Sequence, residues 1–213
     1  MSAIRCILRP ALITCAAIGL SACTSSYTGP IEVTRFVAEP QASVGDQLGK
    51  GTIGLEFPDE IANLTARNAF TAAIAEQLSQ QGYTVILNGE AQPTYRAIIR
   101  TTRTSLAPAS SRGPVNVGVG GSTGSYGSGL GVGIGINLGG GSSGPNVLSQ
   151  LAVRISGPDG TSLWEGRAQQ PVSIKSPYAD VDASARALAR ALFINFPGGN
   201  GETVSINVDD LQE

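Results

Sequence analysis

The stretch LSQLAVRISGPDGTSLWEGRAQQ, residues 148–170, has the most decisive pattern for the fold, because it is typical of a β-hairpin. Two segments rich in alternating apolar residues flank Gly157-Pro158-Asp159-Gly160, and an Asp-Gly pair favours a tight turn between antiparallel strands. Trp164, the only tryptophan, lies in the second segment, where we expect it to anchor the core. The sequence therefore predicts antiparallel strands at 148–156 and 162–170.

Two helices and several further strands surround this hairpin in the sequence. The first helix is expected over about 63–81, with Gly82 as its stop. The second opens within 177–182, with Asp182 as the expected N-cap, and ends before Phe196. The expected buried faces are Leu64, Phe70, Ala73, Ile74 and Leu78 on the first helix, and Ala185, Leu188, Ala189 and Leu192 on the second.

The remaining strands are expected at 31–37, 51–57, 83–87, 94–104 and 204–208. Two helices separated by antiparallel hairpins predict an α+β fold, a mainly antiparallel sheet with both helices packed on one face. We expect one domain over residues 31–208, followed by an acidic tail at 209–213.

Residues 113–144 form a glycine-rich segment that holds 14 of the 28 glycines. Valine and isoleucine alternate there with Asn or Gly, as in 115–119 and 132–138, and strict alternation indicates strands. We therefore expect a glycine-rich hairpin inserted into the domain. One apolar strand face would remain available to an envelope protein partner or to lipid.

The N-terminal region has the parts of a secretory signal: Arg5 and Arg9, an apolar stretch at 11–20, and small residues before Cys23. Leu20-Ser21-Ala22-Cys23 resembles the lipobox of bacterial lipoprotein precursors. This resemblance implies that residues 1–22 are removed, that Cys23 is acylated, and that residues 23–30 form a lipidated tether. The residue after the cysteine is Thr24 and not Asp, which in such lipoproteins implies an outer-membrane location facing the periplasm.

Composition excludes several classes of function. Removal of the signal, which carries two arginines and no acid, changes the formal charge from -2 to -4, and this mild acidity argues against nucleic-acid binding. The chain has no histidine, which removes the commonest general base and the usual nitrogen ligand of zinc. We expect no catalytic residues, no cofactor and no metal site.

Charged clusters offer two other candidate sites. The carboxylate pairs Asp59/Glu60, Asp180/Asp182 and Asp209/Asp210 are interpreted as helix caps or solvated groups. Arg96 and Arg100 share one face of a strand, which is compatible with an anion site. A solvated face whose arginines pair with carboxylates on a neighbouring strand is the preferred interpretation.

A second resemblance covers roughly residues 31–199. Gln81-Gly82-Tyr83, the strand at 95–104, Leu163-Trp164-Glu165-Gly166-Arg167-Ala168 and Asn195-Phe196-Pro197 resemble the envelope lipoproteins that contain domain of unknown function 4136. The resemblance implies an envelope location and the α+β architecture, but no catalytic residues. The glycine-rich insertion departs from the commoner pattern of that family.

These observations predict a non-enzymatic, lipid-anchored protein of the cell envelope, with a binding or structural role in envelope organisation. One alternative is an auxiliary lipoprotein of a lipid-transport complex, which would use the apolar hairpin to contact lipid or a transporter subunit. Another is a carboxylate-dependent hydrolase of envelope glycans, which would need two carboxyl groups about 5 to 9 Å apart in a concave site.

Overall fold

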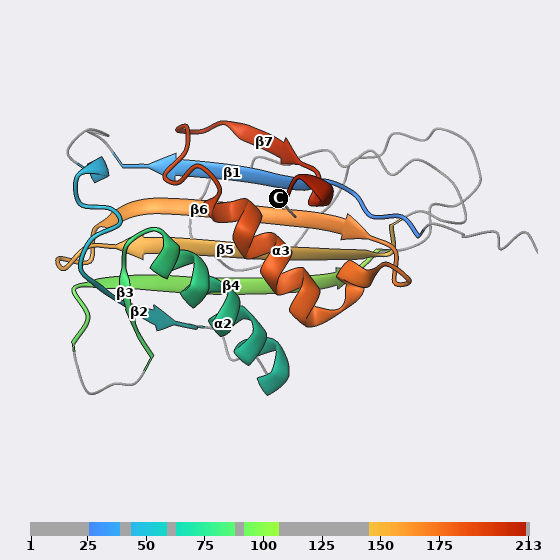
Figure 1. Cartoon of the computed structure of the whole chain (residues 1–213), viewed down its shortest axis with the longest axis horizontal. Helices are drawn as coiled ribbons and strands as arrows, with labels where there is room; N and C mark the ends of the chain where they lie inside the picture. Colours follow the sequence, from blue (N-terminus) through green and yellow to red (C-terminus); the bar gives the residue numbers. More distant parts are fainter. Residues whose placement is uncertain (1–25, 39–43, 59–62, 88–91, 107–144, 212–213) are drawn as a thin grey trace, which may run out of the picture.

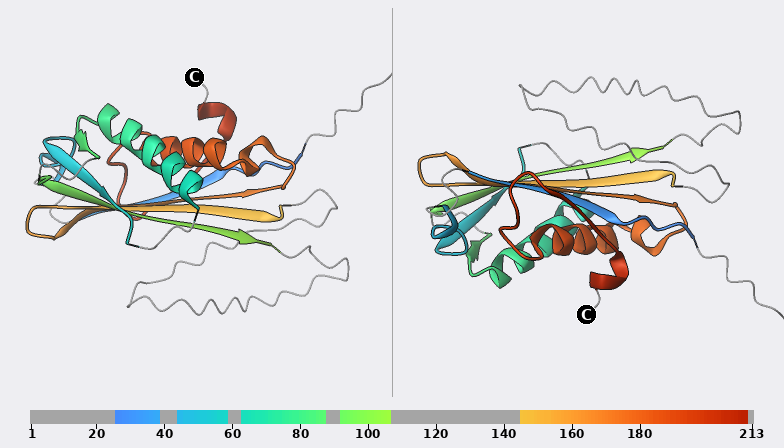
Figure 2. Two further views of the ribbon diagram at one scale, coloured as in Figure 1. Left: turned by 90° about the horizontal axis from the view of Figure 1, so that it is seen from below. Right: turned by 90° about the horizontal axis from the view of Figure 1, so that it is seen from above.

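The computed structural model describes residues 26–38, 44–58, 63–87, 92–106 and 145–211. Within these residues one seven-stranded sheet has the strand order β3-β2-β4-β5-β6-β1-β7. Both helices, α2 and α3, pack on the same face of this sheet (Figures 1 and 2). The predicted α+β fold is thereby confirmed, whereas the glycine-rich hairpin lies outside the described residues.

The elements occur in the predicted order, and their bounds lie close to the predicted ones. They are β1 (Ile31–Val37), β2 (Thr52–Glu56), α2 (Leu64–Gln80), β3 (Thr84–Ile86), β4 (Tyr95–Ser105), β5 (Val147–Ser156), β6 (Ser162–Val172), α3 (Val181–Phe193) and β7 (Thr203–Ile206), with 3-10 helices η1 (Pro177–Ala179) and η2 (Val208–Leu211).

The sheet is antiparallel from β4 to β7 but parallel at its other edge. β2 pairs in parallel with both β3 and β4, and α2 is the crossover that connects β2 to β3. The long strands β4, β5 and β6 pair antiparallel, as expected. The sheet is therefore mixed, and its antiparallel part carries the predicted hairpin.

The turn of the β5–β6 hairpin forms as its sequence predicts. Gly160 has a φ of 83°, a left-handed conformation that glycine adopts without strain. The carboxylate of Asp159 accepts hydrogen bonds from the N–H and the hydroxyl of Thr161, at 3.0 and 2.6 Å. These two bonds hold the pKa of Asp159 below its usual value, because they stabilise the charged form.

Trp164 is fully buried, which confirms its expected place in the core. Its ring stacks on Phe193 of α3 at 5.4 Å between centroids, and its indole N–H donates to the Pro197 carbonyl at 2.9 Å. Gly166 lies beside it on β6, where a Cβ would collide with the Trp164 ring and with Leu192. The hairpin and α3 are thus packed too closely for any side chain at position 166.

The first helix begins at an Asn cap and ends in a Schellman motif. The Asn63 side chain accepts from the N–H of Thr65 at 2.9 Å. At the other end Tyr83 N donates to Leu78 O and Gly82 N donates to Ser79 O, both at 3.1 Å, which confirms the predicted glycine stop.

The predicted buried face of α2 is wrong at one residue, Leu64. Leu64 is 71% exposed, whereas Phe70, Ala73, Ile74 and Leu78 are buried. Six residues correspond to about 600° of helix rotation, so Leu64 lies about 120° away from Phe70 around the axis.

The second helix is capped by Asp180 and not by Asp182, which corrects the prediction. Asp180 has extended backbone angles, and its carboxylate accepts from Ala183 N at 3.0 Å. The 3-10 turn η1 precedes it, so the helix starts at Val181 and Asp182 falls within the first turn. All four residues of the predicted buried face are fully buried: Ala185, Leu188, Ala189 and Leu192.

The C-terminus of α3 is satisfied by a buried arginine. Arg35 lies on the helix-facing side of β1 with 5% of its surface exposed. Its guanidinium donates to Leu192 O at 2.9 Å and to Ala191 O at 2.8 Å, and Phe196 N donates to Phe193 O at 3.1 Å. The last carbonyls of a helix have no partner within it, so these bonds replace water inside the core. Burial lowers the pKa of Arg35.

The chain enters the domain at one end of the sheet. Tyr27 O accepts from Ser173 N at 2.8 Å, Gly29 N donates to Pro171 O at 2.9 Å, and the buried Gln170 side chain donates to Gly29 O at 3.1 Å. Residues 27–30 are therefore part of the packed domain, which corrects the boundary predicted between tether and domain at residue 30.

We call this end of the sheet the tether end. It comprises Tyr27–Pro30, Leu106, Asn146 and Val172–Ser176, which are joined by backbone hydrogen bonds such as Leu106 N to Asn146 O and Asn146 N to Val172 O. The hairpin turn Gly157–Gly160 lies at the opposite end, which we call the turn end (Figure 1). Ten residues of β5 separate the two ends by about 33 Å.

The packed domain also extends further at its C-terminus than the sequence predicts. The segment 209–213 was expected to be an acidic tail, but η2 includes Leu211, which is 5% exposed and belongs to the core. Asp209 and Asp210 are exposed, as expected for solvated acids.

Replacing Asp180 with Ala is expected to lower the free energy of unfolding by about 0.5 to 2 kcal/mol, because the Ala183 N–H loses its cap. Urea denaturation measures the change. Asp182→Ala is the matched control and should have a smaller effect, since Asp182 is exposed in the first turn and does not cap the helix. Equal losses for the two variants would contradict the assignment of the cap.

Replacing Arg35 with Met is expected to lower the free energy of unfolding by about 1 to 3 kcal/mol, the cost of leaving a buried polar group without a partner. The carbonyls of Ala191 and Leu192 lose their donors in this variant. Arg167→Met is the control, because Arg167 is exposed on the neighbouring strand. A stability of Arg35→Met equal to that of the control would show that the guanidinium does not hold α3.

Candidate functional site

The predicted acylation site, Cys23, lies outside the described residues, and so does the glycine-rich segment 113–144. The described chain fixes where both of them join the domain. Three residues separate Cys23 from Tyr27, and Leu106 and Pro145 are the described residues that flank the glycine-rich segment. Both joining points lie at the tether end, which makes this end the first candidate functional region.

The tether end is held together by side-chain as well as backbone hydrogen bonds. The hydroxyls of Thr28 and Ser176 are 2.6 Å apart, and the Asn146 side-chain oxygen accepts from Ile174 N at 2.6 Å. Ser176 N donates to Ser173 O at 2.9 Å, which closes the turn that follows β6. Three separate parts of the chain are thereby fixed together beside the point where the tether begins.

The carboxylate pairs identified in the sequence do not form a described acid-base site. Asp59 and Glu60 lie outside the described residues. Asp180 caps α3 and Asp182 is exposed, whereas Asp209 and Asp210 lie on η2. Within the described residues no group of three or more Cys, Asp or Glu side chains is arranged to hold a metal ion.

Arg96 and Arg100 lie on the face of the sheet opposite the helices, which we call the rear face. Four residues of strand place them about 13 Å apart along β4. Arg96 lines a polar hollow of about 520 Å³ at the turn end, formed by Gln92–Thr94 and Gly157–Gly160. Arg100 does not line this hollow, so the two arginines share a face but not a site.

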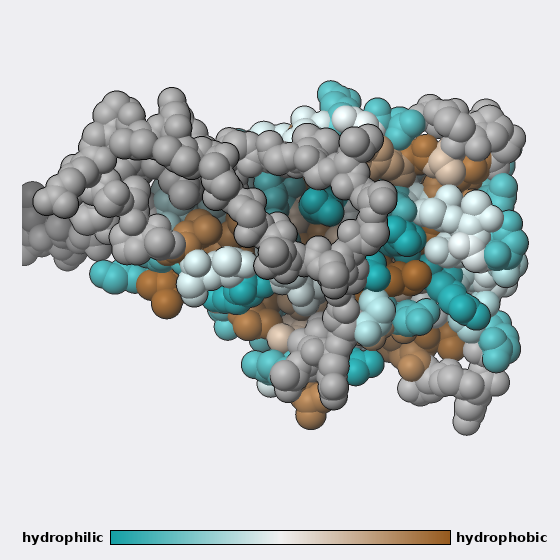
Figure 3. Space-filling model, turned by 180° about the vertical axis from the view of Figure 1, so that it is seen from behind, coloured by the Kyte–Doolittle hydropathy of each residue, from teal (hydrophilic) through white to brown (hydrophobic). Residues whose placement is uncertain are grey.

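The rear face carries polar side chains that bond across the strands. Thr102 donates to Gln150 at 2.9 Å, and Gln150 donates to Gln169 at 3.1 Å. Nearby, Arg154 and Glu165 form an ion pair at 2.7 Å. This pair joins an arginine to a carboxylate on the neighbouring strand, but it involves neither Arg96 nor Arg100, so the pairing expected for those two arginines stays a prediction. Where described side chains are visible in Figure 3, hydrophilic and hydrophobic residues are interspersed.

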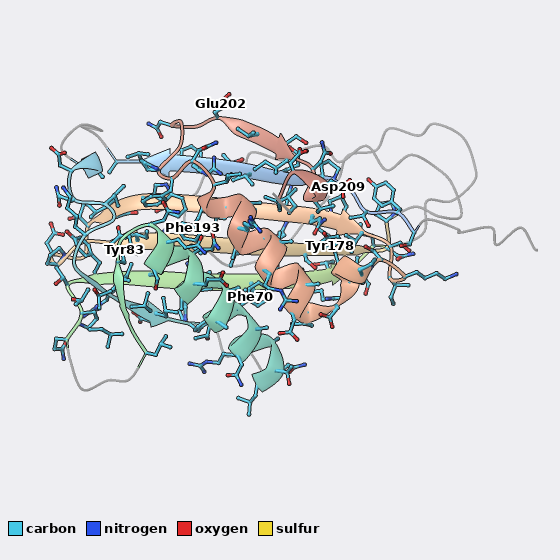
Figure 4. The ribbon with its side chains drawn as sticks, viewed as in Figure 1. Phe70, Tyr83, Tyr178, Phe193, Glu202 and Asp209 are labelled. Atoms are coloured by element: carbon cyan, nitrogen blue, oxygen red, sulfur yellow. The ribbon has the colours of Figure 1, made fainter. Side chains whose placement is uncertain are left out.

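A hollow of about 550 Å³ lies beside α3, and the sequence analysis missed it. We call it the α3 groove; its lining includes Tyr178, Arg186, Arg190, Val208, Asp209 and Leu211. Figure 4 shows Tyr178 on η1 and Asp209 on η2, both next to α3. The sequence feature that could have indicated this groove is the pair Arg186 and Arg190, which are four residues apart on one helix. The packing of Leu211 against α3 is a tertiary contact that no local pattern predicts.

The α3 groove combines an apolar floor with two guanidinium groups and one carboxylate. Its volume falls within the usual range of ligand sites, about 300 to 1,000 Å³. The hollow at the turn end also holds a single carboxylate, Asp159, so neither hollow brings together the pair of carboxyl groups that glycan hydrolysis requires.

In the described part of the chain, no helix is long and apolar enough to cross a membrane. No protein-family model matches the chain, and no curated protein does.

Several solved structures resemble it. A PDZ domain protein from Parabacteroides distasonis is 16% identical with a TM-score of 0.48, over 84% of this chain and 39% of that one, so the chain spans well under half of that protein. The PelC dodecamer from Paraburkholderia phytofirmans is 9% identical with a TM-score of 0.42, over 75% of this chain and 91% of the PelC chain.

Proposed function

We propose that this chain is a lipid-anchored protein of the bacterial outer membrane that faces the periplasm. In this proposal residues 1–22 are removed and Cys23 is acylated, as the lipobox Leu20-Ser21-Ala22-Cys23 implies. Two or more acyl chains anchor a protein stably, whereas one chain binds only marginally. The resemblance to the envelope lipoproteins with domain of unknown function 4136 supports the same location.

The observation that carries this proposal is the position of Cys23 relative to the packed domain. Thr24, Ser25 and Ser26 alone separate it from Tyr27, whose carbonyl is already bonded to Ser173. The four Cα–Cα steps from Cys23 to Tyr27 span at most about 13 to 14 Å. An acyl group on Cys23 would therefore hold the tether end of the domain directly against the bilayer.

The role of the domain in this proposal is binding or structural and not catalytic. Each of the two described hollows contains one carboxylate, which favours this role over glycan hydrolysis. The glycine-rich segment joins the domain at Leu106 and Pro145, so its base is held at the tether end, close to the membrane. We propose that this segment contacts a protein partner in the envelope, with lipid as the alternative occupant.

Replacing Cys23 with Ser is expected to abolish labelling by radioactive palmitate and to move the protein from the outer-membrane fraction to the periplasmic fraction. Immunoblots of fractionated cells measure the shift, with Ser25→Ala as a control that leaves the lipobox intact. If the Cys23→Ser protein stays with washed outer membranes, acylation is not what holds it there.

Replacing residues 114–144 with a short Gly-Ser linker is expected to leave the urea midpoint unchanged and to remove crosslinks to envelope partners. The strands on either side are already paired from Ser105 and Val147 onward, so a short linker can join them. Crosslinking in cells followed by mass spectrometry measures the second effect. A variant that does not fold places the segment in the core, and an unchanged crosslinking pattern removes its proposed role.

A further inference from the structure

We propose that the tether end is itself a membrane-contact surface, on which Tyr27, Ile174 and Lys175 rest at the boundary between lipid headgroups and acyl chains. The inference rests on the proposed function, because it takes Cys23 as the point of attachment. It adds an orientation: the strands of the sheet run away from the bilayer, and the turn end is the part furthest from it.

Two of the seven exposed large apolar side chains of the described residues lie at this end. Ile174 is 69% exposed and Tyr27 is 37% exposed, which is high for large apolar residues. They are neighbours, because Ser173, next to Ile174, donates its N–H to the Tyr27 carbonyl. A single exposed hydrophobic residue needs no explanation, but two adjacent ones beside the attachment point do. Tyrosine is also enriched where protein meets the membrane interface.

Several hydrogen bonds fix the backbone of the turn that carries Ile174. Ile174 N donates to the Asn146 side chain at 2.6 Å, and Lys175 N donates to the Ser173 hydroxyl at 3.3 Å. Ser176 is buried and bonds to Thr28. The fold therefore holds the Ile174 side chain outward at the cost of exposing it to water, which is consistent with a surface that a bilayer covers.

The charged side chains at and next to this end suit contact with bilayers of neutral as well as anionic lipids. Lys175 is exposed beside Ile174 and has a long apolar stem, so its ammonium group can reach the headgroups while the stem stays in the interface. Next to the tether end, in the segment that follows Ser176, Arg103 donates to the Ala179 carbonyl, and Asp180 and Asp182 contribute carboxylates at the start of α3. Because both signs are present, we expect the contact to depend on apolar insertion more than on anionic lipid.

The short tether keeps this end of the domain close to the bilayer once Cys23 is attached. The chain from Cys23 to Tyr27 spans at most about 13 to 14 Å, whereas the turn end is about 33 Å from the tether end along β5. The exposed Leu64, at the start of α2, is as apolar as Ile174 but does not belong to the tether end. Leu64 is therefore the matched control position.

The test uses the mature chain, residues 23–213, with Cys23→Ser and a hexahistidine tag before residue 23. This chain contains no other cysteine, so one introduced cysteine can be labelled uniquely. Ile174→Cys carries an environment-sensitive fluorophore, and Lys175→Cys is a second position on the same turn. The tag binds the protein to phosphatidylcholine vesicles that contain a nickel-chelating lipid.

The label at position 174 or 175 is expected to shift its emission to shorter wavelength on the vesicles and to be quenched by lipids brominated near the headgroup, at low and at high salt. Labels at Leu64→Cys and at Pro158→Cys, at the turn end, should keep their aqueous emission. Aqueous emission at both 174 and 175, or an equal shift at all four positions, would overturn the proposal. Because the tag replaces the acyl anchor, this result is independent of the outcome for Cys23→Ser in cells.

Discussion

The guanidinium of Arg35 reaches from the middle of β1 to the last carbonyls of α3 and fixes that helix on the sheet. The same end of α3 packs its Phe193 ring on Trp164, which itself bonds to the Pro197 carbonyl. Glycine at 198, with a φ of 80°, lies against the Arg35 side chain, and Gly201 N donates to Arg35 O. One buried cation thus joins β1, α3 and the loop before β7, and the helix layer depends on it.

Because both helices pack on one face of the sheet, three regions remain for interaction with other molecules: the rear face, the α3 groove and the tether end. The rear face is largely occupied by its own hydrogen bonds and by the Arg154–Glu165 pair. The rear face also exposes one large apolar side chain, Phe36, whereas the tether end exposes both Tyr27 and Ile174 and lies three residues from Cys23. In the proposed anchored state, the α3 groove and the hollow at the turn end remain accessible from the periplasmic side.

The sequence predicted the existence and type of the regular elements, because periodicity and turn residues are local signals. Gly82 ended α2 and Asp159-Gly160 formed the turn, since both depend on backbone conformations that few residues adopt. Asp180 was missed as the cap because the η1 turn shifts the helix start by two residues. The parallel pairing of β2 was missed because strand direction depends on how α2 crosses the sheet.

The candidate functional regions were harder to predict from the sequence than the helices and strands, because they depend on contacts between distant residues. The burial of Arg35 and of Leu211 depends on partners more than 20 residues away, and an isolated arginine on a strand usually predicts a solvated face. The α3 groove depends on the same kind of distant contact. The predicted lipobox is different, because it is read as a linear motif, and so the prediction of Cys23 as an acylation site needs no knowledge of the fold.

The intact mass of the protein extracted from washed outer membranes tests the central claim most directly. The account predicts a chain that begins at Cys23 and carries acyl groups on that residue, with residues 24–213 unmodified. A mass that corresponds to a chain with unmodified Cys23, or to one that still contains Met1 to Ala22, would contradict it.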